Sequence, residues 1–458
     1  MVERREVEVA VVGAGFAGLA AAHALCEAGI DTVVVEARDR VGGRVLNHRL
    51  ADGRVVEVGG QWIGPTQDRM YALARELGVE TYPTPTTGDS ILLLDGREYR
   101  FAGGLPKLNP AVLLDYGQAM KRLDRMAAKV PLDAPWNAPD ADRLDGQTLE
   151  SWMRRNVRTG SARKLLALGV DAVFATEPGT LSLLWTLFYL HSGGNFDRLL
   201  STRNGAQQDR FVGGSQLLAE RMAARLPDGV LQLDAPVRRV DQNGDAVMLE
   251  CGRLLVRARR AIVTVPPAVQ ARIDFTPSLP ADRAQLLQRM PHGSVIKCMA
   301  VYDEPWWRAE GLDGQGVDTE GPVGVTFDNT PFDPSVEGDP PGVLLAFLEG
   351  DHARALSGVK PEERKRAVIG SLVKLFGPKA ADPVDYVDLD WSAEEWTRGC
   401  YGAHTPPGVL TRYGPALRRP VGNVHWAGTE TAEHWAGYMD GAVESGERAA
   451  NEVLTALA

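Results

Sequence analysis

The chain has 458 residues, of which 44% are hydrophobic and 24% charged, and its formal net charge is −10. This length exceeds what one compact core holds, so we expect two domains. The composition is that of a globular protein and excludes general disorder. The negative charge disfavours nucleic acid and anionic membrane surfaces as partners.

The cysteines are scattered, with no CxxC pair and no spacing typical of metal ligands. Unpaired thiols in a chain of this size indicate a reducing compartment. The charged start of the chain does not resemble a signal peptide, and no apolar run is long enough to span a bilayer. We therefore expect a soluble cytoplasmic protein that binds no metal, no membrane and no nucleic acid.

The first elements predict a nucleotide site. The β-branched run 7–12 indicates a strand buried on both faces, and Gly13, Gly15 and Gly18 then open an alanine-rich helix. Gly13 permits a tight turn, Gly15 lets the backbone approach a pyrophosphate, and Gly18 lets the helix pack closely on the strand. The N-terminus of the helix offers free N–H groups to phosphates.

A second buried strand, 32–35, ends at Glu36, whose carboxylate is placed to accept from ribose hydroxyls and would repel the 2′-phosphate of NADP. Arg38, Gly43 and Arg44 follow in a flexible basic turn. Arg44 directly follows two glycines, which favours a phosphate contact over a solvated loop arginine.

The rest of the chain gives a coarser pattern. We expect a helix over 67–77, a mostly helical and polar-faced region over about 80–205, a helix after 211–215, a strand over 261–265 and a final helix from Met439.

The C-terminal motifs indicate a family. Gly399-Cys400-Tyr401, Trp426–Thr431 and Trp435–Val443 resemble the flavin-containing monoamine oxidases, within the FAD-dependent amine oxidase superfamily. Further matches run from Val9 to Val453, so the resemblance covers nearly the whole chain.

The resemblance implies FAD and a set of residue roles. Tyr401 and Tyr438 resemble two tyrosines that sandwich the amine, and Lys297 resembles a lysine that reaches the flavin through a water. Lys297 lies in an apolar run, where an unpaired lysine is costly unless it faces water or a cofactor. Gln207 resembles a residue lining the substrate cavity, and Leu199 and Leu200 fall where bulky residues gate it. The implied FAD-binding positions are Gly13, Gly15, Gly18, Glu36, Arg38, Gly43, Arg44, Gly60, Gln61, Trp62, Val237, Trp391, Cys400, Gly428, Thr429, Glu430, Gly437, Tyr438 and Met439.

The implied fold class is α/β, with a doubly wound, Rossmann-like FAD-binding domain and an interleaved α+β substrate-binding domain. We assign residues 1–80, 210–290 and 395–458 to the first domain, and 81–209 and 291–394 to the second. The active site is expected at their interface.

The implied reaction oxidises a primary, hydrophobic or arylalkyl amine to an imine and then an aldehyde, while O2 becomes hydrogen peroxide. Loss of hydride from the carbon next to nitrogen requires the neutral amine, and at pH 7 deprotonation of an alkylammonium costs about 4–5 kcal/mol. A desolvated pocket reduces this cost. The partners are thus a small amine and O2, and the family allows for a homodimer.

Cys400 matches a cysteine that forms a thioether with the flavin in membrane-bound animal relatives, and we expect the same bond here. Arg398 departs from the small residue expected before Gly399. The plainer alternative is a buried free thiol.

Four other functions compete with this interpretation. An L-amino-acid oxidase needs a cavity arginine, and Arg198 and Arg203 lie near the gate. A polyamine oxidase needs acidic residues along its tunnel. A flavin-binding module without turnover is disfavoured by the intact Lys297, Tyr401 and Tyr438, and a plain NAD dehydrogenase by the C-terminal flavin segment.

Overall fold

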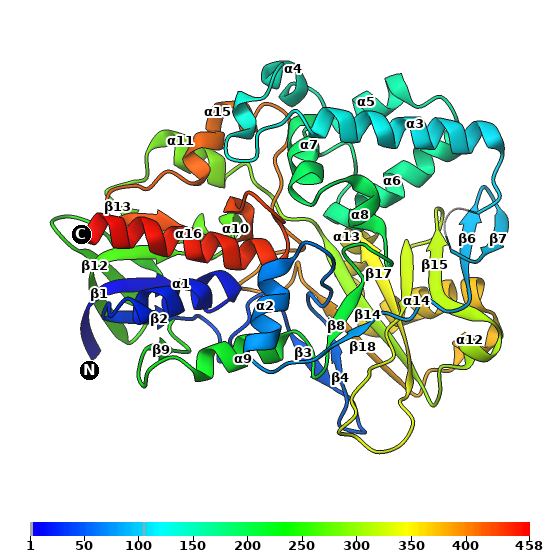
Figure 1. Ribbon diagram of the computed structural model, residues 1–458, viewed down its shortest axis with the longest axis horizontal. Coiled ribbons are helices and arrows are strands. Elements are labelled where there is room, and N and C mark those ends of the chain that lie inside the picture. The colour runs from blue at the N-terminus through cyan, green and yellow to red at the C-terminus, as the bar shows by residue number, and fades with distance from the viewer. Residues whose placement is uncertain (1–2, 104–105) are drawn as a thin grey trace.

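The computed structural model describes residues 3–103 and 106–458 (Figure 1). One sheet is built around β1 (Glu3–Val12), whose parallel neighbours are β2 (Thr32–Val35) and β12 (Leu254–Val263). Its strand order is β13-β10-β11-β12-β1-β2-β9, and β19 (Val424–Trp426) also pairs with β12. The predicted strands 7–12 and 32–35 and the doubly wound fold class are thus confirmed.

Two helices cover one face of this sheet and pack against each other, α1 (Phe16–Glu27) and α16 (Met439–Leu457) (Figure 1). The contact is close, since a Cβ added at Gly446 would come within 2.2 Å of the Ala17 carbonyl oxygen. The first and last helices of the chain therefore share one hydrophobic core with the nucleotide-type sheet.

A second, mainly antiparallel sheet has the order β18-β14-β17-β16-β15-β6-β7. Its central strands, β14 (Val295–Tyr302) and β17 (Gly342–Glu349), are buried along their whole length. Alternate residues such as Ile296 and Leu348 pack with α14 (Pro361–Phe376), whereas Val295 and Phe347 belong to a cluster on the opposite face with Cys400 and Tyr401. This alternation gives the second sheet one face for its own core and one for the site.

The predicted helical region is only partly correct. Its first part forms strands, β5 (Thr81–Pro83), β6 (Asp89–Leu94) and β7 (Arg97–Phe101), because pairing with β8 and β15 outweighs local pattern. The helix α7 (Leu183–Ser192) is not polar-faced but almost entirely buried, since other helices surround it (Figure 1). The other helices of this layer are α3 (Pro110–Ala127), α4 (Ala141–Asp145), α5 (Leu149–Asn156), α6 (Gly160–Phe174) and α8 (Phe196–Leu200).

The predicted helices near residue 70, after residue 215 and at the end of the chain are present, and the strand predicted over 261–265 ends at Val263. Among the residues that the structure describes, no helix is both long and apolar enough to cross a bilayer. The remaining elements are β3 (Asn47–Arg49), β4 (Val55–Glu57), α2 (Asp68–Glu76), β8 (Asp209–Phe211), α9 (Gln216–Ala224), β9 (Leu231–Gln232), β10 (Arg239–Asp241), β11 (Val247–Cys251), α10 (Pro267–Gln270), β13 (Asp274–Thr276), α11 (Ala281–Leu287), α12 (Trp306–Ala309), β15 (Leu312–Asp318), β16 (Val325–Asp328), α13 (Gly350–Ser357), β18 (Asp385–Asp390) and α15 (Leu410–Tyr413).

The strands of the first sheet come from residues 3–35, 231–276 and 424–426, and those of the second from 89–101 and 295–390. The chain therefore passes between the sheets several times, as an interleaved arrangement requires. The residue boundaries of the two domains remain a prediction.

A buried ion pair joins the elements around these sheets. Arg210 of β8 donates from Nη2 to Glu57 of β4 at 2.5 Å, and both side chains are at most 1% exposed. Arg210 also donates to the carbonyl oxygens of Asn329 and Thr330, which follow β16. One guanidinium thus fixes three segments that are distant in sequence.

We predict that Arg210→Met lowers the free energy of unfolding by about 3–5 kcal/mol, because it leaves the Glu57 carboxylate buried without its cation. Chemical denaturation followed by circular dichroism measures the change. The matched control is Arg154→Ala, which breaks the exposed pair with Glu150 and is expected to change stability by less than about 1 kcal/mol. Equal losses in the two variants would contradict the argument.

We also predict that Gly18→Ala destabilises the protein by about 1–3 kcal/mol, since the new Cβ would lie 1.9 Å from the Gly13 carbonyl oxygen and would push α1 off the glycine turn. Gly117 of α3 faces open space, and Gly117→Ala should instead stabilise by about 0.5–1 kcal/mol. Melting temperatures of the two variants, expected to move in opposite directions, test the contrast.

Candidate active site

A single cavity of about 460 Å³ extends from the glycine turn after β1 to the face of the second sheet and the helical layer. Its size is typical of a small-molecule or cofactor site. Nearly all residues that the sequence singled out line it: Gly13, Gly15, Glu36, Arg38, Gly43, Arg44, Gly60, Gln61, Trp62, Leu199, Leu200, Gln207, Val237, Lys297, Trp391, Cys400, Tyr401, Gly428, Thr429, Gly437, Tyr438 and Met439.

Gly18 and Glu430 do not line the cavity. Gly18 faces the Gly13 carbonyl, so it serves the packing of α1 rather than contact with a ligand. Glu430 lies behind Arg44 and accepts from its Nη1 at 2.6 Å and its Nη2 at 3.1 Å. Although burial opposes ionisation, the charge and hydrogen bonds of Arg44 and His292 hold the pKa of Glu430 well below its usual range.

The nucleotide end of the cavity is shaped by backbone groups. Gly13 has a φ of +104°, and Gly15 caps α1 without any side-chain hydrogen bond, so the first N–H groups of the helix face the cavity. Glu36 is 3% exposed and accepts from the backbone N–H groups of Ala14 at 2.7 Å and Arg38 at 3.0 Å. This cradle suits a pyrophosphate with a ribose beside it.

Arg38 and Arg44, the two arginines among the implied FAD-binding positions, are held by acids. Arg38 donates to Glu394 and, at 2.7 Å, to the Thr397 hydroxyl, and Arg44 donates from Nη1 to the Tyr401 carbonyl oxygen at 2.8 Å as well as to Glu430. Arg44 therefore ties the loop that carries Tyr401 to the segment that carries Glu430.

Lys297 is the buried cation of the site. It is 3% exposed and its Nζ donates to the Gly59 carbonyl oxygen at 2.7 Å and to the Gln61 side chain. Gln61 in turn donates to Asn329 at 2.7 Å. Burial lowers the pKa of Lys297 to about 7, so a large fraction of its side chain is neutral at physiological pH.

The predicted tyrosine pair lines the same cavity. Tyr401 donates its hydroxyl hydrogen to Glu349 at 2.8 Å, and its ring lies edge-on to Phe347. Tyr438 is edge-on to Trp435 with ring centroids 4.9 Å apart, and Thr429 donates to its carbonyl oxygen at 2.7 Å. Burial raises the pKa of both tyrosines above the ordinary value, so both remain neutral phenols.

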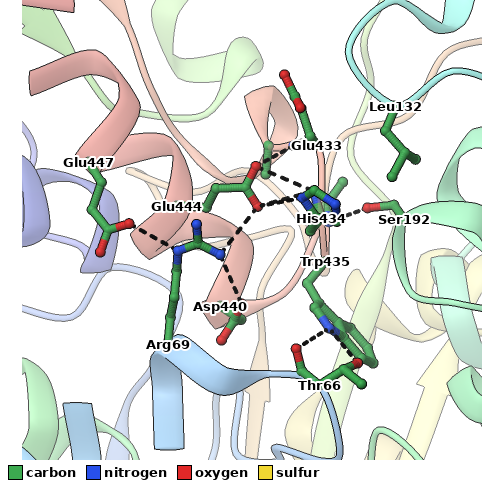
Figure 2. Close-up of polar contacts among 12 residues, drawn as sticks. Thr66, Arg69, Leu132, Ser192, Glu433, His434, Trp435, Asp440, Glu444 and Glu447 are labelled. Atoms are coloured by element: carbon green, nitrogen blue, oxygen red, sulfur yellow. Dashed lines mark hydrogen bonds and ion pairs between the residues drawn. The ribbon is translucent and has the colours of Figure 1, made fainter. Parts of the chain in front are cut away.

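Figure 2 shows how the segment before Tyr438 is anchored. Trp435 donates to the Thr66 carbonyl oxygen at 3.1 Å, and Arg69 pairs with Glu447 at 3.0 Å and Glu444 at 3.8 Å. Glu444, Glu433 and His434 stand close enough together for a metal ion. The Glu444 carboxylate, however, already accepts from the backbone N–H groups of both neighbours and faces Arg69, so this cluster serves as a structural clamp.

The far end of the cavity is apolar. Gln207 donates to the Leu199 carbonyl oxygen at 3.0 Å, and its buried Oε1 has no donor among the described residues. The surrounding wall consists of Leu92, Phe101, Leu108, Val112, Leu113, Tyr116, Leu165, Leu168, Val173, Leu199 and Leu200.

The arginines that an amino-acid oxidase would use lie elsewhere. Arg198 donates to Thr66, and Arg203 is exposed and donates to Thr86, and neither lines the cavity. Arg398, the departure from the family pattern, is also exposed and donates to the Glu395 carbonyl oxygen. Its charge therefore points away from Cys400, which is buried in the cavity wall.

Several residues that were not predicted from the sequence also line the cavity, chiefly Glu349, Phe347 and Tyr189. Glu349 ends an apolar run, which is the same signal that singled out Lys297. Tyr189 lies in α7 with its ring centroid 6.1 Å from that of Tyr438, and nothing in its local pattern distinguishes it from core.

The residues fit a bound flavin dinucleotide. Gly15 and Gly43 both line the cavity, and Gly43 has a φ of +60°, a left-handed conformation that favours glycine, so no side chain from either residue fills the cradle. The buried Trp62 Nε1 has no acceptor among the described residues although the ring lines the cavity, as expected of a donor reserved for a ligand.

Comparison with known proteins agrees with this geometry. A family profile described as flavin-containing amine oxidoreductase matches residues 16–454. The chain is 44% identical to AofH of Mycobacterium tuberculosis, named as a flavin-containing monoamine oxidase, over 98% of this chain and 97% of that protein. It is 40% identical to amine oxidase [flavin-containing] A of Sus scrofa, over 98% and 85% of the two chains.

Solved structures give the same answer. Wild-type putrescine oxidase bound to putrescine matches with a TM-score of 0.94 at 35% identity, covering 99% of this chain and 100% of that one. Cyclohexylamine oxidase from Brevibacterium oxydans matches with a TM-score of 0.93 at 35% identity, covering 98% and 99%. With the glycine cradle, the buried lysine and the tyrosine-lined cavity in place, the chain belongs to the flavin-containing amine oxidase family and is an oxidoreductase that acts on amines.

Proposed function

We propose that the substrates are hydrophobic primary amines, alkyl or arylalkyl, bound with the amine near Tyr401 and Tyr438 and the side chain among the leucines of the far end. The single observation that carries this proposal is the apolar wall of that end. Beyond Glu36 at the ribose position, Glu349 is the acid among the lining residues described. A row of acids for a polyamine is missing from that lining, and its arginines, Arg38 and Arg44, are already paired with Glu394 and Glu430.

In this proposal a flavin held by the glycine turn, Glu36 and Arg44 would supply the acceptor for the hydride lost from the carbon next to nitrogen, and O2 would be reduced to hydrogen peroxide. Tyr401 and Tyr438 orient the amine between neutral aromatic faces, which do not fix its proton as a carboxylate in direct contact would. Lys297, anchored by Gly59 and Gln61, would supply a hydrogen-bond donor near the flavin. Because its pKa is about 7, the charge of this donor changes near neutral pH. The apolar wall excludes water and so favours the neutral amine.

The test is a series of n-alkylamines with peroxide release as readout. We expect kcat/KM to rise about fourfold per added methylene, since burying a CH2 group contributes about 0.8 kcal/mol. Leu113→Ala, which removes part of the wall, should weaken this increase, whereas Leu114→Ala on the neighbouring exposed position should not. Putrescine should be a poorer substrate than butylamine, because its second ammonium would lie among leucines. A preference for putrescine would refute the proposed substrate class.

We further propose that Cys400 carries the flavin through a thioether. Its side chain is buried in the cavity wall, and burial raises the pKa of the thiol to about 12, so the resting sulfur is protonated. If the bond forms, the yellow colour of acid-precipitated protein stays with the pellet, and Cys400→Ala releases it to the supernatant. Cys298→Ala is the matched control, since that buried thiol belongs to the core on the other face of the sheet and should leave the colour in the pellet. Release of colour from wild-type protein would refute the bond and leave amine oxidation intact.

Cytoplasmic location and a homodimer stay predictions from sequence and resemblance, as do the roles given to individual FAD-binding residues.

A further inference from the structure

Glu349 is a buried acid in the cavity wall that the proposed mechanism does not use. It ends β17 opposite Val295 of β14, while Phe347 stands opposite Lys297, so all four side chains share the face that lines the site. The side chain is 6% exposed in total. Its Oε1 accepts the Tyr401 hydroxyl at 2.8 Å, and its Oε2 has no donor among the described residues.

The charged and titratable groups around Glu349 leave it without a cation. Asp171 of α6 is an acid whose charge acts on Glu349, and Tyr401 is a neutral phenol. The Nζ of Lys297 already donates to Gly59 and Gln61. β16 presents Val325 toward the site, and the charges at the start of α13, Asp351 and Arg354, interact with Asp171 rather than with Glu349. Burial raises the pKa of Glu349 to about 8, opposed by the hydrogen bond from Tyr401 and assisted by the charge of Asp171.

A purely structural carboxyl is a poor explanation for this position. Placing an acid in an apolar wall costs several kcal/mol if it ionises, whereas a glutamine would accept the same hydrogen bond from Tyr401 without that cost. An alkylammonium substrate, on the other hand, must give up a proton before hydride can leave, and the proton needs an acceptor with an affinity not far below that of the amine.

We propose that Glu349 is that acceptor, with the Tyr401 hydroxyl as the relay between the bound ammonium and the carboxylate. The ammonium gives a proton to the phenol oxygen as the phenol gives its own to Oε1, so the substrate becomes a neutral amine, Glu349 becomes a carboxylic acid and Tyr401 is unchanged. No electrons move in this step. The inference rests on the proposed placement of the amine beside Tyr401, and it makes Glu349 a residue that acts through another.

The kinetic test compares butylamine with its 2,2-difluoro analogue, which is similar in size but weakly basic and therefore arrives already neutral. Glu349→Gln keeps an acceptor for Tyr401 but cannot take a proton. We expect Glu349→Gln to lower kcat/KM about 10²-fold for butylamine and less than about tenfold for the fluorinated amine. The rise of wild-type kcat/KM with pH around 8 should also disappear, because the acceptor must be ionised to act. Equal losses for both amines, or no loss, would overturn the proposal.

Asp171→Asn is the matched control, since it removes the neighbouring acid from outside the cavity lining and lowers the pKa of Glu349 by relieving repulsion. It should move the rise in kcat/KM to lower pH and leave the plateau unchanged. An unmoved rise would overturn the assignment of that pKa to Glu349.

A readout independent of turnover is the carboxyl stretching band in infrared difference spectra of the holoenzyme, wild type minus Glu349→Gln. A protonated carboxyl band that fades between pH 7 and 9 supports the proposal, and a carboxylate that stays ionised from pH 6 upward overturns it. This titration decides the role of Glu349 even if alkylamines are not the substrates. A preference for other amines would change the proposed substrate class alone.

Discussion

The site depends on how the protein accommodates a lysine in the middle of a buried strand. Lys297 belongs to β14, where every residue is buried, and its Nζ has to find acceptors without water. Its acceptors are the Gly59 carbonyl oxygen and the Gln61 side chain, which lie in the segment directly after β4. The same segment continues into Trp62, and it is held by the ion pair between Glu57 and Arg210. The positions of Lys297, of the loop around Gly59 and Gly60 and of the second sheet therefore depend on one another.

The same burial controls the charge of the cavity. The ammonium of Lys297, the carboxyl group of Glu349 and the phenols of Tyr401 and Tyr438 lie in a wall that is otherwise mostly apolar. Desolvation lowers the pKa of the lysine and raises those of the other three, so it favours the neutral form of each group. The pKa values of Lys297 and Glu349 converge to about 7 and about 8, so both groups exchange protons in the range where an enzyme works. This range suits the proton transfer proposed for Glu349, since an alkylammonium substrate arrives charged and has to react neutral. The arginines of the cavity, Arg38 and Arg44, are different, because each is paired with a carboxylate that fixes its position.

The elements that the sequence predicted well are those formed by interactions between residues close together in the chain. The strand 7–12, the glycine turn and α1 follow from residues adjacent in the chain, and so does the end of the next strand at Glu36. Roles that depend on tertiary approach were harder to assign. Glu430 was grouped with the ligand-binding residues, yet it lies behind the lining under Arg44. Gly18, grouped with them too, has the packing role that its place in the glycine turn predicts. The strands at 81–101 were taken for part of a helical region because their pairing partners, β8 and β15, lie more than a hundred residues further along the chain.

The sequence by itself determined the dinucleotide-type fold, the family resemblance and the presence of a buried lysine and a pair of tyrosines, because each is encoded in a contiguous motif. Only the tertiary structure decided which groups line the cavity together. The register between β14 and β17 sets Glu349 on the same face as Lys297, and the course of α7 brings Tyr189 beside Tyr438. A one-residue shift in that register would turn Glu349 toward α14, and no local pattern in either strand specifies the register. The chemistry of the pocket therefore rests on pairings between distant segments, which the packing of the whole chain selects.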